Sequence, residues 1–283
     1  MIKNNLRKLQ LTELEMLMDI DKLCRKNKIR YFLVGGTLLG AVRHKGFIPW
    51  DDDIDIAMPR EDYEKFINLC TKKDILGEKY FLHCDETDEK YYNPFIKVKK
   101  NNTTFAEKSI EKIDTHKGIF IDIFPYDYVP KQDSPLQKIQ SILVKNIQAT
   151  VYVKCNINDS KEQKRKILYK IFNMFSTTTL KKMSRTISTI FNKNEANKYV
   201  VSLTGCFPYY KETLLKEKVF PLKEIEFEGH NFFGLQDNDY YLEKIYGNYM
   251  KLPPKNQRMT HNPEFIDFNN GKKWSNTNIK DNK

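Results

Sequence analysis

Two aspartates separated by one residue, Asp53 and Asp55, lie in the stretch Asp51-Asp-Asp-Ile-Asp-Ile-Ala57. The alternation of carboxylates and isoleucines predicts a strand over 53–57. Residues i and i+2 of a strand point to the same face, with Cα atoms about 6.5–7 Å apart. Carboxylates placed in this way can bind one or two divalent ions, as in two-metal phosphoryl transfer. The alternative is a plain acidic pair on an edge strand.

A third carboxylate, Asp122, lies among apolar residues in Gly118-Ile-Phe-Ile-Asp-Ile-Phe-Pro125. A lone buried carboxylate is unfavourable unless it is paired or binds a metal. Asp122 is therefore the candidate third ligand of a Mg²⁺ or Mn²⁺ site. Its alternatives are a hydrogen bond to a loop or an ion pair with a lysine. Asp51 would face the same side as Asp53 or cap the loop.

A pair of glycines followed by a threonine, Gly35-Gly36-Thr37, ends an apolar run before the acidic strand. Glycines let backbone N–H groups approach an anion closely, and a following helix N-terminus adds partial positive charge. A strand over 29–34 and a short helix over 37–43 would flank this turn, which we interpret as a phosphate-binding turn with Thr37 adding a hydroxyl. The chain contains neither a Walker pattern nor GxGxxG, which disfavours P-loop and Rossmann proteins.

Basic residues close to these motifs are candidate substrate ligands. Arg43 could clamp a phosphate, and His44 could act in general acid–base catalysis, although a lone histidine is more often structural. Lys97 lies between apolar neighbours in Phe95-Ile-Lys-Val98 and is predicted to point into a cleft.

Three residues further from the acidic strand complete the candidate site. Trp50 could support the acidic loop, stack on a base or a quaternary ammonium, or simply pack in the core. Arg258 and His261 follow a helix stop and could reach back to the site, or serve only in packing of their own loop.

The elements that would position these residues indicate an α+β protein with a largely helical second half. Apolar residues spaced three to four apart predict a first helix over 6–27. The other expected elements are a helix over 59–71, strands over 80–84, 95–99 and 119–124, helical stretches over 134–200, a hairpin over 222–233 and a helix capped by Asp237 that ends before Gly247.

Bulk properties fit one large folded domain or two modest ones. The 283 residues carry a net charge of +11, which a solvated lysine surface explains most simply. The alternative is attraction to a membrane surface, a polyanionic polymer or a nucleotide. Five scattered cysteines without a CxxC pair argue against disulfides and zinc and for a reducing compartment. We expect neither a signal peptide nor a membrane span.

The continuous stretch from Leu33-Val-Gly-Gly-Thr37 to Asp53-Ile-Asp-Ile-Ala-Met58 resembles the signature of the LicD family. This family comprises phosphocholine transferases of bacterial surface glycans, related to the fukutin-type phosphoribitol transferases. The stretches at 118–125, at 241–250 and at Leu252-Pro-Pro254, with Arg258 and His261, resemble it too. The resemblance spans roughly residues 10–265. The cysteine-rich zinc insertion of fukutin-related proteins is missing, which favours the bacterial branch.

The resemblance implies a nucleotidyltransferase-like fold, with a mixed β-sheet core flanked by helices. The glycine turn of that superfamily falls on Gly35, Gly36 and Thr37, and its metal carboxylates fall on Asp53, Asp55 and Asp122. The regions expected are a catalytic core over 1–130, a helical insertion or acceptor region over 131–205, a C-terminal hairpin, helix and loop that complete the site over 206–268, and a disordered tail over 269–283.

The implied activity is metal-dependent transfer of a phospho-alcohol, phosphocholine first, from a CDP-activated donor to a hydroxyl of a glycan or lipid-linked glycan of teichoic acid or lipopolysaccharide type, with release of CMP. One carboxylate, with Asp122 as the candidate, would take the acceptor proton. Tyr91, Tyr92, Tyr126 and Tyr128 could line a head-group cage, but the sequence does not fix the head group.

Two other functions stay open. One is a nucleotidyltransferase that uses an NTP to modify a small hydroxylated acceptor, and the other is a non-catalytic basic protein that docks on an anionic polymer or membrane. Nucleic-acid binding is disfavoured, because arginines are not clustered and no helix-turn-helix or aromatic RNA motif is found. The expected location is cytoplasmic, with peripheral contact at the inner face of the membrane left open.

Overall fold

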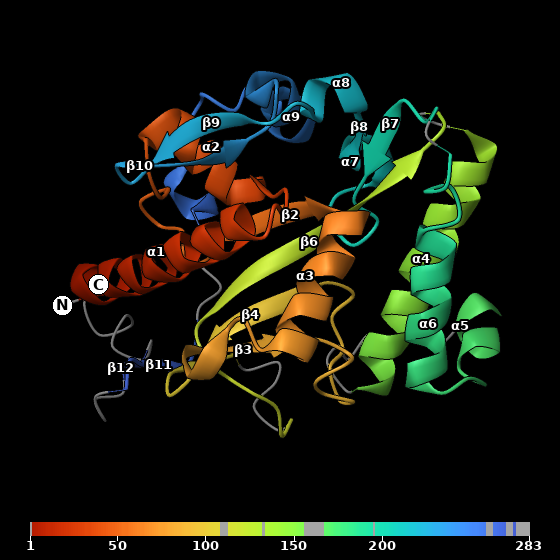
Figure 1. Cartoon of the computed structure of the whole chain (residues 1–283), viewed down its shortest axis with the longest axis horizontal. Helices are drawn as coiled ribbons and strands as arrows, with labels where there is room; N and C mark the ends of the chain where they lie inside the picture. The colour runs from red at the N-terminus through yellow and green to blue at the C-terminus, as the bar shows by residue number, and fades with distance from the viewer. Residues whose placement is uncertain are drawn as a thin grey trace.

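The computed structural model describes residues 2–107, 113–131, 134–155, 167–194, 196–258, 263–269 and 274–275. Figure 1 shows its elements. The helices are α1 (Ile2–Lys26), α2 (Gly35–His44), α3 (Arg60–Lys73), η1 (Gly77–Lys79), α4 (Pro135–Lys154), α5 (Ile167–Phe172), α6 (Thr177–Ser188), α7 (Tyr209–Glu212), α8 (Lys216–Val219), α9 (Asn238–Tyr246) and η4 (Lys255–Gln257). The strands are β1 (Phe32–Leu33), β2 (Asp55–Pro59), β3 (Tyr80–His83), β4 (Ile96–Lys100), β5 (Thr104–Ala106), β6 (Phe120–Val129), β7 (Tyr199–Val201), β8 (Thr213–Leu215), β9 (Lys223–Phe227), β10 (His230–Gly234), β11 (Phe265–Asp267) and β12 (Trp274–Ser275).

A mixed sheet of seven strands forms the centre of the protein. Its main path runs β1-β2-β6-β4-β3, and β7 and then β8 extend it from the far half of β6. β2 and β6 are parallel, whereas the other pairs are antiparallel. The predicted α+β class with a mixed sheet is therefore confirmed.

The two faces of the central strands carry different side chains. Ile54, Ile56, Ile121 and Ile123 are fully buried in the main core. Because side chains alternate along a strand, the residues between them, including Asp122, point to the other face. The sequence pattern therefore sets aside one sheet face for packing and keeps polar residues on the opposite face.

The remaining elements gather around this sheet in two groups. Figure 1 shows α4, α5 and α6 together at one end of the molecule, and the β9–β10 hairpin near α2 and α9. β11 pairs with both β5 and β12, so that residues near the C-terminus lie beside the segment that follows β4. Segments far apart in the chain therefore lie side by side in this fold.

Several expected elements are confirmed with small shifts of their bounds. The first helix, the helix after Pro59, the three strands after it and the hairpin are all present. Asp237 caps α9, because its side chain accepts a hydrogen bond from the backbone N–H of Tyr240, and the helix ends before Gly247.

Other expectations were wrong. The strand expected over 53–57 begins at Asp55, so Asp53 lies in the preceding loop and the two aspartates do not share a strand face by simple alternation. The strand expected over 29–34 is reduced to Phe32–Leu33. The helix expected from Thr37 begins at Gly35, whose φ of +56° lies in the left-handed region that glycine adopts without strain.

The second half is less helical than expected. Strands β7 and β8 extend the main sheet, and β9, β10 and β11 follow. Residues 156–166, inside the predicted helical stretch, lie outside the described residues. Of the tail predicted to be disordered, Trp274–Ser275 pairs with β11, and residues 270–273 and 276–283 lie outside the described part of the chain.

Two negative expectations concern cysteines and membrane spans. All five cysteines are free thiols. Among the described helices, none has both the length and the apolar content to cross a bilayer.

Candidate active site

Four polar side chains form a row across the sheet, which we call the polar row: Asp55, Asp122, Lys97 and His83. Asp55 of β2 is the register partner of Asp122 in β6, Lys97 of β4 is also opposite Asp122, and His83 of β3 is opposite Lys97. Directly opposite residues share a face of the sheet and interact. The Lys97 Nζ lies 2.6 Å and 2.9 Å from the two carboxylate oxygens of Asp122, in a buried ion pair.

The residues around Asp55 explain the two glycines that begin α2. A Cβ atom added to Gly35 would lie 2.8 Å from Asp55 Oδ2, and one added to Gly36 would lie 2.7 Å from Asp51 Oδ2. The hydroxyl of Thr37 accepts a hydrogen bond of 2.8 Å from the backbone N–H of Asp55. The first turn of α2 thus receives two carboxylates at close range, where the helix N-terminus favours negative charge.

This arrangement refines the interpretation of the glycine turn. The backbone N–H of Gly35 donates to the hydroxyl of Tyr241 at 3.0 Å, and Thr37 accepts from Asp55. In this structure these groups hold the acidic loop and α9 in place. Their direct contact with a substrate phosphate stays a prediction.

Negative charge is crowded at this end of the polar row, which we call the acid end (Asp51, Asp53 and Asp55). Burial, together with the charges of Asp53, Asp122 and Asp51, raises the pKa of Asp55 well above its usual range. Neighbouring carboxylates disfavour one another's charged form unless a cation is present. A bound cation would therefore relieve this repulsion.

The acid end fits a hard divalent cation in its chemistry, because Mg²⁺ and Mn²⁺ prefer carboxylate oxygens. The carboxylates of the acid end are not arranged around a common point where an ion could lie. Within the described residues, no set of three His, Cys, Asp or Glu side chains is drawn together as a metal site. Both oxygens of Asp122 are engaged by Lys97, which is the lysine pairing that the sequence left as the alternative for Asp122.

The sequence did not identify Glu13 of α1 as part of this site. Its side chain is 2% exposed, and its Oε2 atom has no hydrogen-bond partner in the described part of the chain. Burial, followed by the charges of Asp53, Asp52 and Asp51, raises its pKa well above the usual range. In the sequence, Glu13 is only one charged residue among the apolar residues of the first helix. Its place among those apolar residues was the one sign that its side chain is buried.

Three of the predicted basic and aromatic ligands, Arg43, Trp50 and Arg258, contact each other or the C-terminal part of the chain. Arg43 donates to the ring Nε2 of His44 at 2.9 Å and to the carbonyl of Tyr249 at 2.7 Å. The Arg258 guanidinium carbon lies 4.6 Å from the centre of the Trp50 ring. Burial lowers the pKa of Arg43, and the positive charge of Arg258 acts in the same direction.

The two predicted histidine ligands, His44 and His261, are not shown to reach the acid end. Burial and the charge of Arg43 lower the pKa of His44, so this histidine is neutral at neutral pH and accepts a hydrogen bond from its neighbour. His261 lies outside the described residues. Their roles in acid–base catalysis and substrate binding remain predictions.

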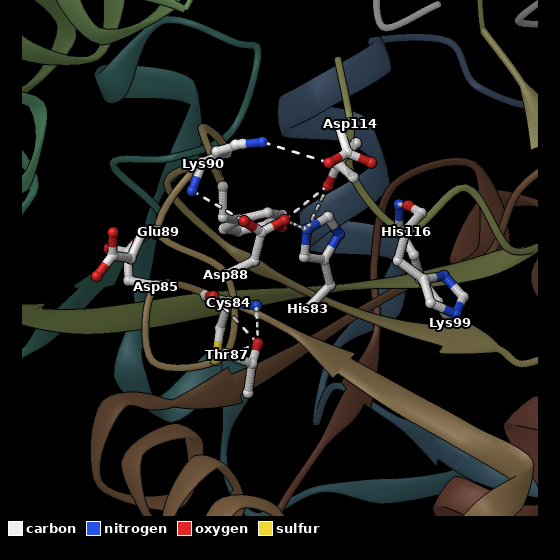
Figure 2. Close-up of polar contacts among 12 residues, drawn as sticks. His83, Cys84, Asp85, Thr87, Asp88, Glu89, Lys90, Lys99, Asp114 and His116 are labelled. Atoms are coloured by element: carbon white, nitrogen blue, oxygen red, sulfur yellow. Dashed lines mark hydrogen bonds and ion pairs between the residues drawn. The ribbon is translucent and has the colours of Figure 1, made fainter.

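The other end of the polar row continues into basic residues, which we call the basic end (Lys99, His83 and His116); Lys99 and His83 are buried, and His116 is half-buried. Figure 2 shows His83 turned toward Asp88, and His116 beside Lys99. His83 Nε2 lies 2.9 Å from Asp88 Oδ2, and the Lys99 Nζ donates to the backbone carbonyl of His116. Burial lowers the pKa of His83 to about 4 and, with the charge of Lys97, that of Lys99 to about 7.

Both histidines and Lys99 were missed by sequence reasoning, because each stands alone in its stretch of the chain. Only the register of β3 and β4 brings His83 opposite Lys97. The sequence indicates that β3 and β4 are strands, but it does not indicate the register in which they pair.

The tyrosines considered for a head-group cage separate into two places. The Tyr91 ring centre lies 4.2 Å from that of His83, and Tyr92 packs between Tyr91 and Tyr152 with ring centres about 6 Å apart. Tyr126 is buried in the main core, and Tyr128 lies beneath the Lys216 ammonium. Only Tyr91 and Tyr92 of the four are therefore adjacent to the polar row.

Comparison with known proteins identifies the family of this chain. A family model described as LicD/FKTN/FKRP, nucleotidyltransferase domain, matches residues 28–158, which include Asp53, Asp55, Lys97 and Asp122. The chain is 30% identical over 266 residues to the lipopolysaccharide cholinephosphotransferase LicD of Haemophilus influenzae, covering 92% of this chain and 97% of that protein. The chain belongs to the LicD family.

A second relative is similar over a much shorter stretch. The ribitol 5-phosphate transferase FKRP of Homo sapiens is 56% identical over 34 residues, which cover 12% of this chain and 7% of FKRP. An uncharacterised protein of Rickettsia prowazekii is 29% identical over 129 residues, or 39% of this chain and 48% of that protein.

Proposed function

We propose that this protein transfers phosphocholine from CDP-choline to a hydroxyl of a cell-surface glycan or glycolipid and releases CMP, with Mg²⁺ or Mn²⁺ as cofactor. The observation that carries this proposal is the polar row, which joins crowded carboxylates to a buried lysine on one sheet face. Membership of the LicD family supports it, because two named relatives, LicD and FKRP, are a cholinephosphotransferase and a ribitol 5-phosphate transferase.

In the proposed reaction, the acceptor oxygen forms a bond to the phosphorus that carries the choline. The bond between this phosphorus and the bridging oxygen of the pyrophosphate breaks, and CMP leaves with the electron pair. The acceptor hydroxyl proton passes to a carboxylate of the polar row. Asp122 is our candidate, because it lies opposite Asp55 on the same face of the sheet.

The metal cofactor, when bound, would neutralise charge on the pyrophosphate and on the leaving CMP. Asp53 and Asp55 would hold it, and Asp122 would join them by exchanging the Lys97 ammonium for the cation. Lys97 would then be available to a phosphate oxygen. The Thr37 hydroxyl positions Asp55 by accepting a hydrogen bond from the backbone N–H of Asp55. Arg43 and Arg258 supply positive charge near the acid end.

The head group would be recognised by aromatic side chains near the row. A quaternary ammonium is attracted to the faces of Tyr and Trp rings. Tyr91 and Tyr92 lie at the basic end, and Trp50 lies beside Arg258. We assign choline to the Tyr91–Tyr92 side, since the Trp50 ring already faces a guanidinium.

The test is CMP release from CDP-choline, CDP-ethanolamine, CDP-glycerol and CDP-ribitol, with Mg²⁺ or with EDTA, in the presence and absence of host surface glycan. We expect metal-dependent CMP release from CDP-choline and its loss in the folded Asp53→Asn variant. Release from another donor alone would keep the transferase and correct the head group. Silence from all four donors, with nucleotide transferred from an NTP to the acceptor, would instead establish a nucleotidyltransferase.

A further inference from the structure

Positive charge is concentrated in one part of the molecule, the group of helices α4, α5 and α6. The described residues of this group, 135–155 and 167–194, contain eight Lys and Arg and no Asp or Glu. The whole chain has a net charge of +11, so this small part of the sequence supplies most of it. The group forms one end of the molecule (Figure 1), where its field is not diluted by acidic neighbours within the group.

The same helices expose large apolar side chains to solvent. On α4, Leu136 is 65% exposed and Ile139 54%, and Ile142 follows three residues further. On α5 and the turn after it, Ile167 is 77% exposed and Met174 84%. Singly exposed apolar residues are common, but their repetition along two packed helices marks an interaction surface.

The helices that expose these apolar residues are nevertheless packed against one another. Their inner faces form a core of their own with Ile147, Val151, Phe172 and Leu180. The group therefore has a dry inner side and an outer side that carries both apolar residues and lysines, among them the exposed Lys138 and Lys170. Two of its cations are used internally, because Lys181 pairs with Asp85 and Arg185 with Glu64 and Glu86.

Charge complementarity decides what this surface fits. A second copy of the chain would bring a surface of the same sign against it, which is repulsive. A hydrophilic polyanion would satisfy the lysines but not the apolar residues. A bilayer with anionic lipids satisfies both, because lysines attract phosphate head groups while apolar side chains enter the interfacial region.

We propose that the outer side of α4 and α5 docks the protein on the surface of an anionic phospholipid bilayer. The contact is peripheral, with the helices lying on the membrane. Lys138 and Lys170 contact lipid phosphates, and Leu136, Ile139, Ile142, Ile167 and Met174 insert among the head groups. This docking does not depend on the catalytic proposal.

The test is co-sedimentation of the full-length protein with vesicles of phosphatidylcholine, with or without phosphatidylglycerol. We expect binding to the anionic vesicles that weakens by about tenfold or more when phosphatidylglycerol is omitted or salt is raised. Two variants address the two components: Leu136→Ser/Ile139→Ser/Ile142→Ser and Lys138→Glu/Lys170→Glu. Each should lower binding severalfold.

Matched control variants carry the same changes elsewhere. Leu11→Ser/Met250→Ser/Leu252→Ser removes exposed apolar residues of comparable exposure, and Lys72→Glu/Lys73→Glu reverses exposed charges at the end of α3. Both should bind nearly as the parent protein does, apart from a small effect of net charge. All substituted residues are exposed, so thermal melting should confirm that each variant folds.

Three outcomes would overturn the proposal. Equal binding to neutral and anionic vesicles would remove the role of charge. Loss of binding in the charge variant with none in the serine variant would show a purely electrostatic attachment and remove the role of the apolar residues. Equal effects of helix and control variants would exclude this surface. The Asp55→Asn variant should bind vesicles normally, so failure of docking and failure of the catalytic proposal remain separate results.

Discussion

The two ends of the polar row bury opposite charges in different ways. At the acid end, burial and three neighbouring carboxylates raise the pKa of Asp55. At the basic end, burial and the charge of Lys97 lower the pKa of Lys99 to about 7, while hydrogen bonds to the His116 carbonyl and between His83 and Asp88 hold the side chains in place. Between the two ends, Lys97 and Asp122 neutralise each other.

The difference bears on where a cation would bind. The basic end holds Lys99 and His83 by hydrogen bonds within the chain. The acid end concentrates like charges against the first turn of α2, an arrangement that becomes favourable when a cation binds. The comparison supports our proposal that a metal binds at the acid end and that Lys97, between the two ends, positions a phosphate.

Removal of a carboxylate at the acid end should have the largest effect. We expect Asp55→Asn to lower the rate of CMP release by about 10²–10³-fold or more, because an electrostatic group that acts on the transition state is lost. The same variant should unfold at higher urea concentration, since the substitution removes a buried, repelled charge. Asp114→Asn, at an exposed side chain, is the matched control and should change neither quantity. A fully active, folded Asp55→Asn would contradict the assignment.

Breaking the ion pair between Lys97 and Asp122 should have the second largest effect. Lys97→Met leaves the Asp122 carboxylate buried without its cation, which should lower the free energy of unfolding by about 3–5 kcal/mol. Lys97→Met/Asp122→Asn should recover most of that loss, because the buried charge is gone as well. Urea denaturation of the two single variants and the double variant measures the coupling. Additive single effects would show that the pair is not coupled.

The support of Asp55 by Thr37 should have a smaller effect. Thr37→Val removes the acceptor for the backbone N–H of Asp55 in a buried position, which should destabilise the protein by about 1–2 kcal/mol. CMP release should also decrease, through a lower kcat with little change in KM. Thr37→Ser keeps the hydroxyl and should restore kcat, an outcome that a purely packing role of Thr37 would not give.

The basic end should show a distinct pH dependence of stability. The native state releases the Lys99 proton near pH 7, whereas the unfolded chain keeps it until about pH 10.5. The unfolded state binds more protons in this window, so the contribution of Lys99 to stability rises with pH from 7 to 10.5. Lys99→Met should therefore stabilise the protein more at pH 6 than at pH 9, as measured by urea denaturation.

Asp55 should show the opposite trend. Its native pKa is raised above 3.8, so the native state binds more protons and stability falls as pH rises above that value. The gain from Asp55→Asn should accordingly be larger at pH 7 than at pH 4. The same sign of pH dependence in both variants would contradict the comparison between the two ends.

The sequence predicted much of the fold, because its elements have local signals. Apolar spacing marks α1, Pro59 and Asp237 mark two helix starts, and the alternation of carboxylates and isoleucines marks β2. It predicted the acidic residues as well. The start of β2 at Asp55 was missed, since the run of aspartates before it carries no signal for where pairing begins.

What the sequence could not predict depends on long-range register. The ion pair of Lys97 with Asp122 and the position of His83 follow from how β3, β4 and β6 align. The close approach of Asp55 to Gly35 and of Asp51 to Gly36 depends on how the acidic loop folds over α2. The glycines suggested a phosphate turn, whereas the structure shows that they also make room for carboxylates.

The most direct test of this account is calorimetric titration of Mn²⁺ into the protein in the presence of CMP. The comparison is between the parent protein, Asp53→Asn/Asp55→Asn and the exposed control Asp114→Asn. The account predicts that the parent and the control bind Mn²⁺ alike and that the double variant binds it at least about tenfold more weakly. Equal Mn²⁺ affinity in all three proteins would contradict the assignment of the metal site to the acid end.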